Sequence, residues 1–205
     1  MNTPPPITVV NVGYRSTHYW VVGAGTSRLL MDIGWPGTLG TLKANLARVG
    51  IPLHEIRYAL ATHYHIDHAG LAEELKREGV SLLVLEVQRP AIPLMKTWVK
   101  PADRYVEITE KGNVILSFEQ SRDFLAQMGL SGEILPTPGH TDHCVSLLLD
   151  NGFAFTGDLP AEALAFDNPV ALASWRLLRA KGATRVYPAH GPVWYLEDMP
   201  DAPTS

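Results

Sequence analysis

The sequence predicts an α/β sandwich built from two αβ halves, because strand-like and helix-like segments alternate along it. The second observation is the position of residues that can bind a metal. Four strand-like segments are each followed by such a residue: RYALAT by His63, EILPTPG by His140, GFAFTG by Asp158 and RVYPA by His190. Ligands of open α/β sheets collect at the carboxyl ends of strands. We therefore expect four separate segments to converge on one rim.

The first half opens with three strands. They are apolar runs between turn residues and lie at 7–12, 18–22 and 28–33. Leucines at spacings of three and four predict an amphipathic helix over 38–49, which Gly50 ends. The apolar run 57–62 is expected to be a buried strand that leads into the ligand loop. A helix over 69–79 follows, with Gly79 as its stop.

The second half continues the pattern after an apolar strand at 81–85. The segment 86–112 has neither a helical nor a strand period, so we expect it to be irregular. Strands are predicted at 114–118, 133–137, 144–149, 152–157 and 185–189, and helices at 121–129 and 169–181. The last helix is well delimited, with Asn168 at its cap, Pro169 at its first position and Gly182 just past its end.

The motif THYHIDHAG at 62–70 places four metal ligands in six residues: His63, His65, Asp67 and His68. Transition metals such as zinc take imidazole nitrogen and carboxylate oxygen, and a catalytic site keeps one position open for water or substrate. His63 and His65 stand two apart, so in an extended loop both imidazoles point the same way. The alternative is a histidine-rich surface loop, which does not explain the three further candidates in matching contexts downstream.

Composition agrees with a compact enzyme. With 205 residues, 46% of them hydrophobic, the chain can bury a full core as one domain over 1–205, with a core at about 7–191 and a tail at 192–205. The net charge of −4 gives no electrostatic signature for nucleic acid or an acidic membrane. The single cysteine, Cys144, cannot form an internal disulfide. No leader-like N-terminus and no apolar run of roughly 18–20 residues is present, so a cytoplasmic location is expected.

The motifs together resemble those of the metallo-β-lactamase-fold superfamily of hydrolases. The resemblance rests on HYHIDH at 63–68, GH at 139–140, GD at 157–158, AHG at 189–191 and the strand LLMDIG with Asp32, and it runs from about residue 7 to 191. It implies an αββα sandwich of two mixed sheets with helices on the outer faces. It identifies the superfamily and leaves the substrate open.

The resemblance also implies a two-metal site, with zinc expected and iron or manganese as alternatives. His63, His65 and His140 would hold the first metal, while Asp67, His68 and His190 would hold the second. Asp158 would bridge them, since a carboxylate can span metals roughly 3.5–4 Å apart that share one hydroxide. That hydroxide would be the nucleophile, with Asp67 and Asp158 as catalytic carboxylates. We expect hydrolysis of a small ester, thioester or lactone, by a chain that is a monomer or a homo-oligomer.

Two other functions remain open at this point. A mononuclear iron persulfide dioxygenase of the same fold uses positions like those of His63, His140 and Asp158. A non-catalytic metal-binding module is the other, although a complete seven-ligand set is more than structure needs. Among hydrolases, glyoxalase II-like thioesterases add a helical domain after the last ligand, and acyl-homoserine lactonases place a tyrosine shortly after the bridging aspartate. Only 15 residues follow His190 here and GDLPAEALAF contains no tyrosine, so neither of these substrate classes is expected.

Individual residues also have alternative roles. Asp67 could cap the following helix, and Asp32 could either support a ligand imidazole or only form a turn. His143 could line the pocket or be structural, and Cys144 is expected to be a buried small residue rather than a reactive thiol. The segment 86–112, with Trp98 and several cations, is predicted either to form a substrate wall or to be surface packing in which Trp98 covers the core.

Overall fold

Two mixed β-sheets form the centre of the computed structural model, which describes residues 6–198. The first sheet has the order β1-β2-β3-β4-β5-β6, with antiparallel pairs up to β3 and parallel pairs from there on. Its strands are β1 (Thr8–Asn11), β2 (Trp20–Ala24), β3 (Ser27–Met31), β4 (Ile56–Leu60), β5 (Ser81–Leu85) and β6 (Asn113–Leu116).

The second sheet has the order β11-β10-β9-β8-β7, and only its β9–β10 pair is parallel among the strands described. Its strands are β7 (Gly132–Pro136), β8 (Val145–Leu149), β9 (Phe153–Gly157), β10 (Arg185–Pro188) and β11 (Trp194–Tyr195). Both sheets are therefore mixed, as predicted.

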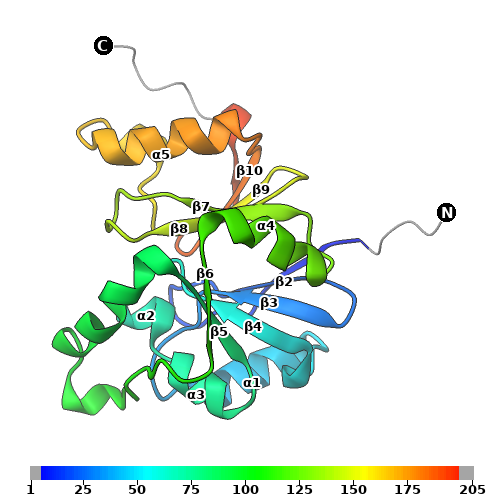
Figure 1. Cartoon of the computed structure of the whole chain (residues 1–205), viewed down its shortest axis with the longest axis vertical. Helices are drawn as coiled ribbons and strands as arrows, with labels where there is room; N and C mark the ends of the chain where they lie inside the picture. Colours follow the sequence, from blue (N-terminus) through cyan, green and yellow to red (C-terminus); the bar gives the residue numbers. More distant parts are fainter. Residues whose placement is uncertain (1–5, 199–205) are drawn as a thin grey trace.

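Helices cover the outer faces of the two sheets (Figure 1). α1 (Leu39–Arg48) and α3 (Ala72–Arg77) lie on the first sheet, and α5 (Pro169–Ala180) lies on the second. The other helices are α2 (Ile66–Ala69) and α4 (Phe118–Gln127), with short 3-10 turns at η1 (Leu53–Glu55), η3 (Pro101–Asp103), η4 (Glu162–Leu164) and η5 (Leu196–Asp198). The segment 86–112, predicted to be irregular, begins with the 12-residue 3-10 helix η2 (Glu86–Thr97). The predicted αββα sandwich is confirmed.

The strands divide their side chains between three apolar clusters. In β3, Leu29 and Met31 point between the sheets, whereas Leu30 packs under α1 and α3. This is the two-residue alternation of a strand that is buried on both faces. Burying one leucine side chain contributes about 1.5–3 kcal/mol, so the three layers hold the sandwich mainly by hydrophobic packing. A third cluster joins the second sheet to α5 around Trp175.

Three predicted elements have different boundaries in the structure. The strand predicted at 114–118 ends at Leu116 and pairs with β5, so it belongs to the first sheet and not to the second half. Ser117 N–H donates to Oε1 of Gln120 at 2.9 Å, a capping interaction that starts α4 at Phe118 instead of 121. The predicted helix 69–79 is shortened to α3, and only Ala69 belongs to the preceding α2, because the N–H of Leu71 donates to the carbonyl of Gly34 instead of continuing a helix.

The segment predicted as a tail over 192–205 is in part structural. β11 pairs with β10, Trp194 packs on Trp175 with ring centroids 5.3 Å apart, and Leu196 is buried. These residues lie at the edge of the second sheet. The sequence pattern does not predict this position. Residues 199–205, with Pro200 and Pro203, lie outside the described residues. Within residues 6–198, no helix has both the length and the apolar character needed to cross a bilayer.

Candidate metal centre

The candidate ligands lie in loops, and in the short helix α2, that follow the carboxyl ends of strands from both sheets. Gly157 is essential to this convergence, because a Cβ atom there would collide with the side chain of Thr62. Its φ of 57° is also in the left-handed region that favours glycine. Next to it, the N–H of Val145 donates to the carbonyl of Thr62 at 2.9 Å and joins the two sheets. All seven predicted ligands gather at this rim: His63, His65, Asp67, His68, His140, Asp158 and His190.

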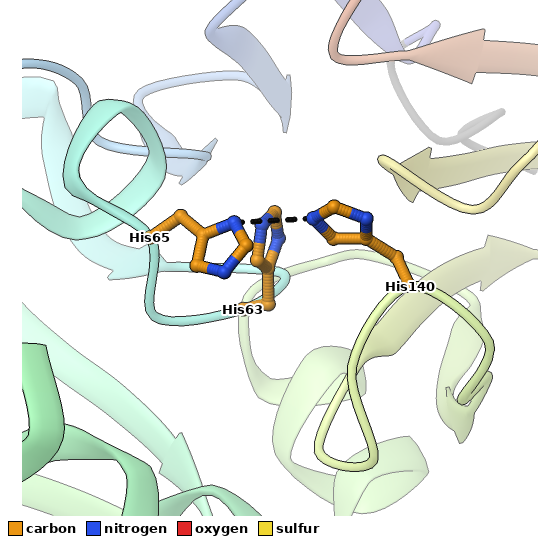
Figure 2. A group of neighbouring side chains, drawn as sticks. All are labelled: His63, His65 and His140. Atoms are coloured by element: carbon orange, nitrogen blue, oxygen red, sulfur yellow. Dashed lines mark hydrogen bonds between the residues drawn. The ribbon is translucent and has the colours of Figure 1, made fainter. Parts of the chain in front are cut away.

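Three imidazoles form the first group of potential ligands. His63 and His65 come from the loop after β4, and His140 comes from the loop between β7 and β8; their rings converge in Figure 2. One nitrogen from each lies within 4.8 Å of the others. Nε2 of His140 is 3.1 Å from Nδ1 of His65. This is the set that the resemblance assigned to the first metal.

The second group consists of Asp67, His68 and His190, again with donor atoms within 4.8 Å of one another. Oδ2 of Asp67 is 3.5 Å from Nε2 of His68 and 3.4 Å from Nε2 of His190. Asp67 lies in the first turn of α2, whose N-cap residue is His65, and the N-cap residue of α3 is Leu71, so Asp67 caps neither helix. The carboxylate faces the two imidazoles instead, so the capping alternative is wrong.

Asp158 lies between the two groups. Its Oδ2 atom is 3.3 Å from Nε2 of His68, 3.6 Å from Nε2 of His140 and 3.8 Å from Nε2 of His63. Its Oδ1 atom is 3.4 Å from Nε2 of His190. The two oxygens of one carboxylate thus face imidazoles of both groups, which is the placement that a bridging ligand requires.

Electrostatics prepare most of these imidazoles for a metal. Burial and the neighbouring histidines hold the pKa of His63 well below its usual range, and burial also lowers the pKa of His65 and of His140. Burial alone would lower the pKa of His68, but Asp32 and Asp158 outweigh it and raise this pKa to about 10. Three imidazoles are therefore neutral donors at neutral pH, while His68 holds a proton that a metal would displace.

The donor atoms fit a transition metal better than they fit any partner within the described chain. Nε2 of His63, Nε2 of His68 and Oδ1 of Asp158 are buried and have no hydrogen-bond partner among residues 6–198. Buried polar atoms are ordinarily paired, so such orphans point to a missing ligand. Imidazole nitrogen with carboxylate oxygen suits zinc, iron and manganese.

A family comparison identifies the chain. The model of the metallo-β-lactamase superfamily matches residues 12–190. The chain belongs to the metallo-β-lactamase superfamily. This match includes all seven candidate ligands and the supporting Asp32, so the resemblance drawn from the motifs is confirmed.

Relatives within the superfamily are distant. The chain is 27% identical over 196 residues to beta-lactamase-like protein 2 homolog of Caenorhabditis elegans, a match that covers 94% of this chain and 60% of that protein. It is 28% identical to atrochrysone carboxyl ACP thioesterase of Aspergillus fumigatus, with 91% of this chain and 39% of that protein covered. The chain thus spans less than two thirds of the length of either relative. The B3 metallo-β-lactamase BLEG-1 has the same fold, with a TM-score of 0.72, 20% identity and coverage of 97% and 98%.

A cavity of about 250 Å³ adjoins the candidate ligands. His140, Asp158 and His190 form part of its wall, and Leu159 and Trp194 add apolar surface. Its other lining residues are Thr156, Gly157, Ala161, Val186 and Pro188. Such a volume accommodates a small molecule beside the ligand groups.

The sequence analysis did not predict several residues that support the site. The hydroxyl of Thr17 donates to Oδ2 of Asp67 at 2.9 Å, and Nδ1 of His190 lies 2.7 Å from the carbonyl of Ser16. Both contacts come from the turn between β1 and β2, which has no motif. Asn168 was predicted only as a helix cap, yet its amide also donates to the carbonyl of Gly139 at 2.8 Å and so fixes the loop that carries His140.

Gln88 is a further support for the ligand loop, and it lies in the segment predicted to be irregular. Its buried side chain donates to the carbonyls of Ala61 and Thr62 at 2.9 and 3.2 Å and accepts from the N–H of Leu85. The side-chain amide of Gln88 therefore holds the backbone between the end of β4 and the ligand motif at 62–70. A lone glutamine in a segment without a period gives no signal of this role.

The remaining candidates take these positions. Cys144 is buried, and burial raises the pKa of its thiol, so the prediction of a buried small residue is confirmed. Half-buried His143 has its Nε2 atom 3.4 Å from the N–H of Tyr64. Trp98 is 73% exposed, so the expectation that it covers the core is wrong; Met95 of the same segment is buried in its place.

Proposed function

We propose that this chain is a metal-dependent hydrolase that cleaves a small ester, thioester or lactone, with two zinc ions per chain. The observation that carries the proposal is the set of buried, unpartnered donor atoms of His63, His68 and Asp158 among seven converging ligands. A metal that only stabilises a fold is bound in a closed site. An open site with two groups of ligands is therefore more than a structural role requires. Membership of a superfamily that includes a thioesterase relative supports hydrolysis.

Each ligand group has its own task in this proposal. His63, His65 and His140 would hold the first zinc, and Asp67, His68 and His190 the second, with Asp158 shared between them. Zinc bound there would supply the Lewis acidity that activates water and polarises the carbonyl of the substrate. No serine or cysteine nucleophile is needed, which agrees with the raised pKa of the buried Cys144 thiol.

The chain's own residues would orient the reaction. Thr17 fixes one oxygen of Asp67 through its hydroxyl, and the carbonyl of Ser16 accepts from Nδ1 of His190, which leaves Nε2 of that ring free to ligate. The apolar wall around Leu159 and Trp194 would exclude water from the body of a small substrate. These contacts are preorganised, because they link loops that are held by strand ends.

The test combines metal analysis with a substrate panel. Zinc-loaded protein should cleave at least one ester, thioester or lactone without oxygen, and the product acid should carry label from H₂¹⁸O. His65→Ala should abolish the activity, whereas Asp142→Ala, a change at an exposed neighbour of the site, should not.

Two results would count against the hydrolase. Oxygen consumption with a persulfide substrate, supported by iron and not by zinc, would favour the dioxygenase. Metal binding with no turnover of any of these substrates would favour a metal-binding module.

A further inference from the structure

A second cavity, of about 320 Å³, lies beside the turn that contacts the metal ligands. Its two cationic side chains are Arg15, from that turn, and Arg104, from the connection after η3. Both arginines are exposed, and neither guanidinium forms an ion pair with any of residues 6–198. Two arginines that line one cavity without an ion pair can offer charge-assisted hydrogen bonds to an anion.

Arg15 is held in a defined orientation. Its guanidinium carbon lies 5.2 Å from the ring centroid of Trp35 and 5.4 Å from that of Tyr14, so two aromatic faces contact the cation. The N–H groups lie at the edge of the planar guanidinium, so aromatic rings that contact its face leave these groups available as donors.

Arg104 and the floor of the cavity are also fixed. The aliphatic stem of Arg104 packs on Gly37, where a Cβ atom would be only 3.3 Å from Cβ of Arg104. The N–H of Gly37 donates to Glu74 at 2.8 Å, and the hydroxyl of Thr38 donates to the carbonyl of Trp35 at 2.6 Å. These two hydrogen bonds therefore hold the loop that lies between the two arginines.

The backbone at both arginines is strained. Of the residues that the structure describes, three non-glycine residues have a left-handed φ: Arg15 at 58°, Asp32 at 59° and Arg104 at 57°. Such conformations cost about 1–3 kcal/mol each and tend to be kept at functional sites. Asp32 contacts the candidate ligand His68, and the other two line this cavity.

The cavity is coupled to the metal centre through the chain. Arg15 is followed directly by Ser16 and Thr17, whose carbonyl and hydroxyl contact His190 and Asp67. The turn is closed by backbone hydrogen bonds between Tyr14 and Thr17. A group bound at Arg15 would therefore lie one short turn away from two of the proposed ligands.

We propose that Arg15 and Arg104 bind a carboxylate carried by the substrate, remote from the bond that is cleaved. This inference rests on the proposed function and narrows its substrate class to an anionic ester, thioester or lactone. Asp103 also lines the cavity, and its carboxylate accepts from the N–H of Lys100 at 2.6 Å. Two cations and one anion leave a single positive charge, which matches a carboxylate better than a phosphate dianion.

The activity arm of the test uses p-nitrophenyl esters of glutarate and of valerate, which have acyl chains of equal length and differ in the terminal carboxylate. Arg15→Gln and Arg104→Gln should each raise KM for the glutarate ester about tenfold or more, because each removes a charge-assisted hydrogen bond. In both variants the loss of kcat/KM should be at least about tenfold larger for the glutarate ester than for the valerate ester, which has no carboxylate to bind. Arg176→Gln, which removes an exposed cation of α5, is the matched control and should change neither.

The binding arm does not depend on turnover. In metal-free protein, glutarate should shift the Nε–H resonances of Arg15 and Arg104, and each glutamine variant should weaken this binding. Absence of any shift, or equal KM values of the two esters in the wild type and both variants, would overturn the carboxylate site. Shifts with inorganic phosphate but not with glutarate would overturn it as well. If the wild type cleaved no ester while glutarate still bound, the hydrolase would fail and the site would stand.

Discussion

Nδ1 of His68 lies 3.3 Å from Oδ2 of Asp32, and both side chains are buried. The other oxygen of Asp32 accepts from the N–H and the hydroxyl of Thr62, at 2.9 and 2.8 Å. One carboxylate thus anchors the start of the ligand loop and orients an imidazole on it, with Nε2 of His68 turned toward Asp67 and Asp158. This contact with a candidate ligand agrees with the supporting role considered for Asp32, and its left-handed φ of 59° agrees with the turn.

Asp32→Asn is the sharpest test of this relationship. Asparagine has the same size and tolerates the left-handed φ of 59°, so the substitution removes the charge without adding backbone strain. Loss of such a supporting contact typically weakens metal affinity about 10–100-fold, and the second site should be affected more than the first. Competition with a chelator measures both sites. Unchanged affinity at the second site would show that Asp32 serves the turn alone.

The stability of the metal-free protein should depend on pH because the pKa of His68 is raised. Its pKa is raised from 6.5 to about 10 in the metal-free protein, so the stability it contributes is complete below pH 6.5 and is lost as pH rises through 10. Between pH 7 and 8.5, the free energy of unfolding should fall by about 1 kcal/mol per pH unit. Tyrosine of the unfolded chain ionises above this window. Burial raises the pKa of Cys144, so ionisation of this thiol in the unfolded chain adds to the fall only toward the upper end of the window.

Urea titrations of chelator-treated protein at several pH values measure this slope. Asp32→Asn removes the main cause of the raised pKa, so it should flatten the dependence. A wild-type curve that is already flat over the window would contradict the assignment of the proton to His68.

Asp158→Ala should weaken both metal sites. Its Oδ2 atom faces His63, His68 and His140, and its Oδ1 atom faces His190. Elemental analysis of zinc-replete protein should fall from about two metals per chain toward none, as the two sites share this ligand. Asp67→Ala should remove only the second metal. A ceiling of one metal in the wild type, with Asp67→Ala leaving it in place, would reject the two-metal site.

Gln88→Leu should destabilise the protein without touching a ligand. The change leaves the buried N–H of Leu85 and the carbonyl of Ala61 without their side-chain partner, at a cost of about 2–4 kcal/mol in the free energy of unfolding. Gln127→Leu alters an exposed glutamine of α4 and should stay within about 0.5 kcal/mol. Urea denaturation compares the two variants, and equal midpoints would show that Gln88 adds nothing to the ligand loop.

Most of the ligand set could be predicted from the sequence because it is local. Four candidates stand within one short motif, and each of the other three follows an apolar run that reads as a buried strand. The boundaries that were wrong have physical causes outside such patterns. Leu71 breaks the predicted helix because its N–H is taken by Gly34, which precedes it by 37 residues and lies beside it in the fold.

The sequence by itself determined the family, the layered α/β architecture and the seven candidate ligands, since apolar periodicity and ligand spacing are properties of neighbouring residues. Only the tertiary structure decided how these ligands are held. The contacts of Asp32 with His68, of Thr17 with Asp67 and the cavity between Arg15 and Arg104 join residues far apart in the chain. They exist because the two sheets stack and bring loop ends together, and no local pattern encodes the geometry of that packing.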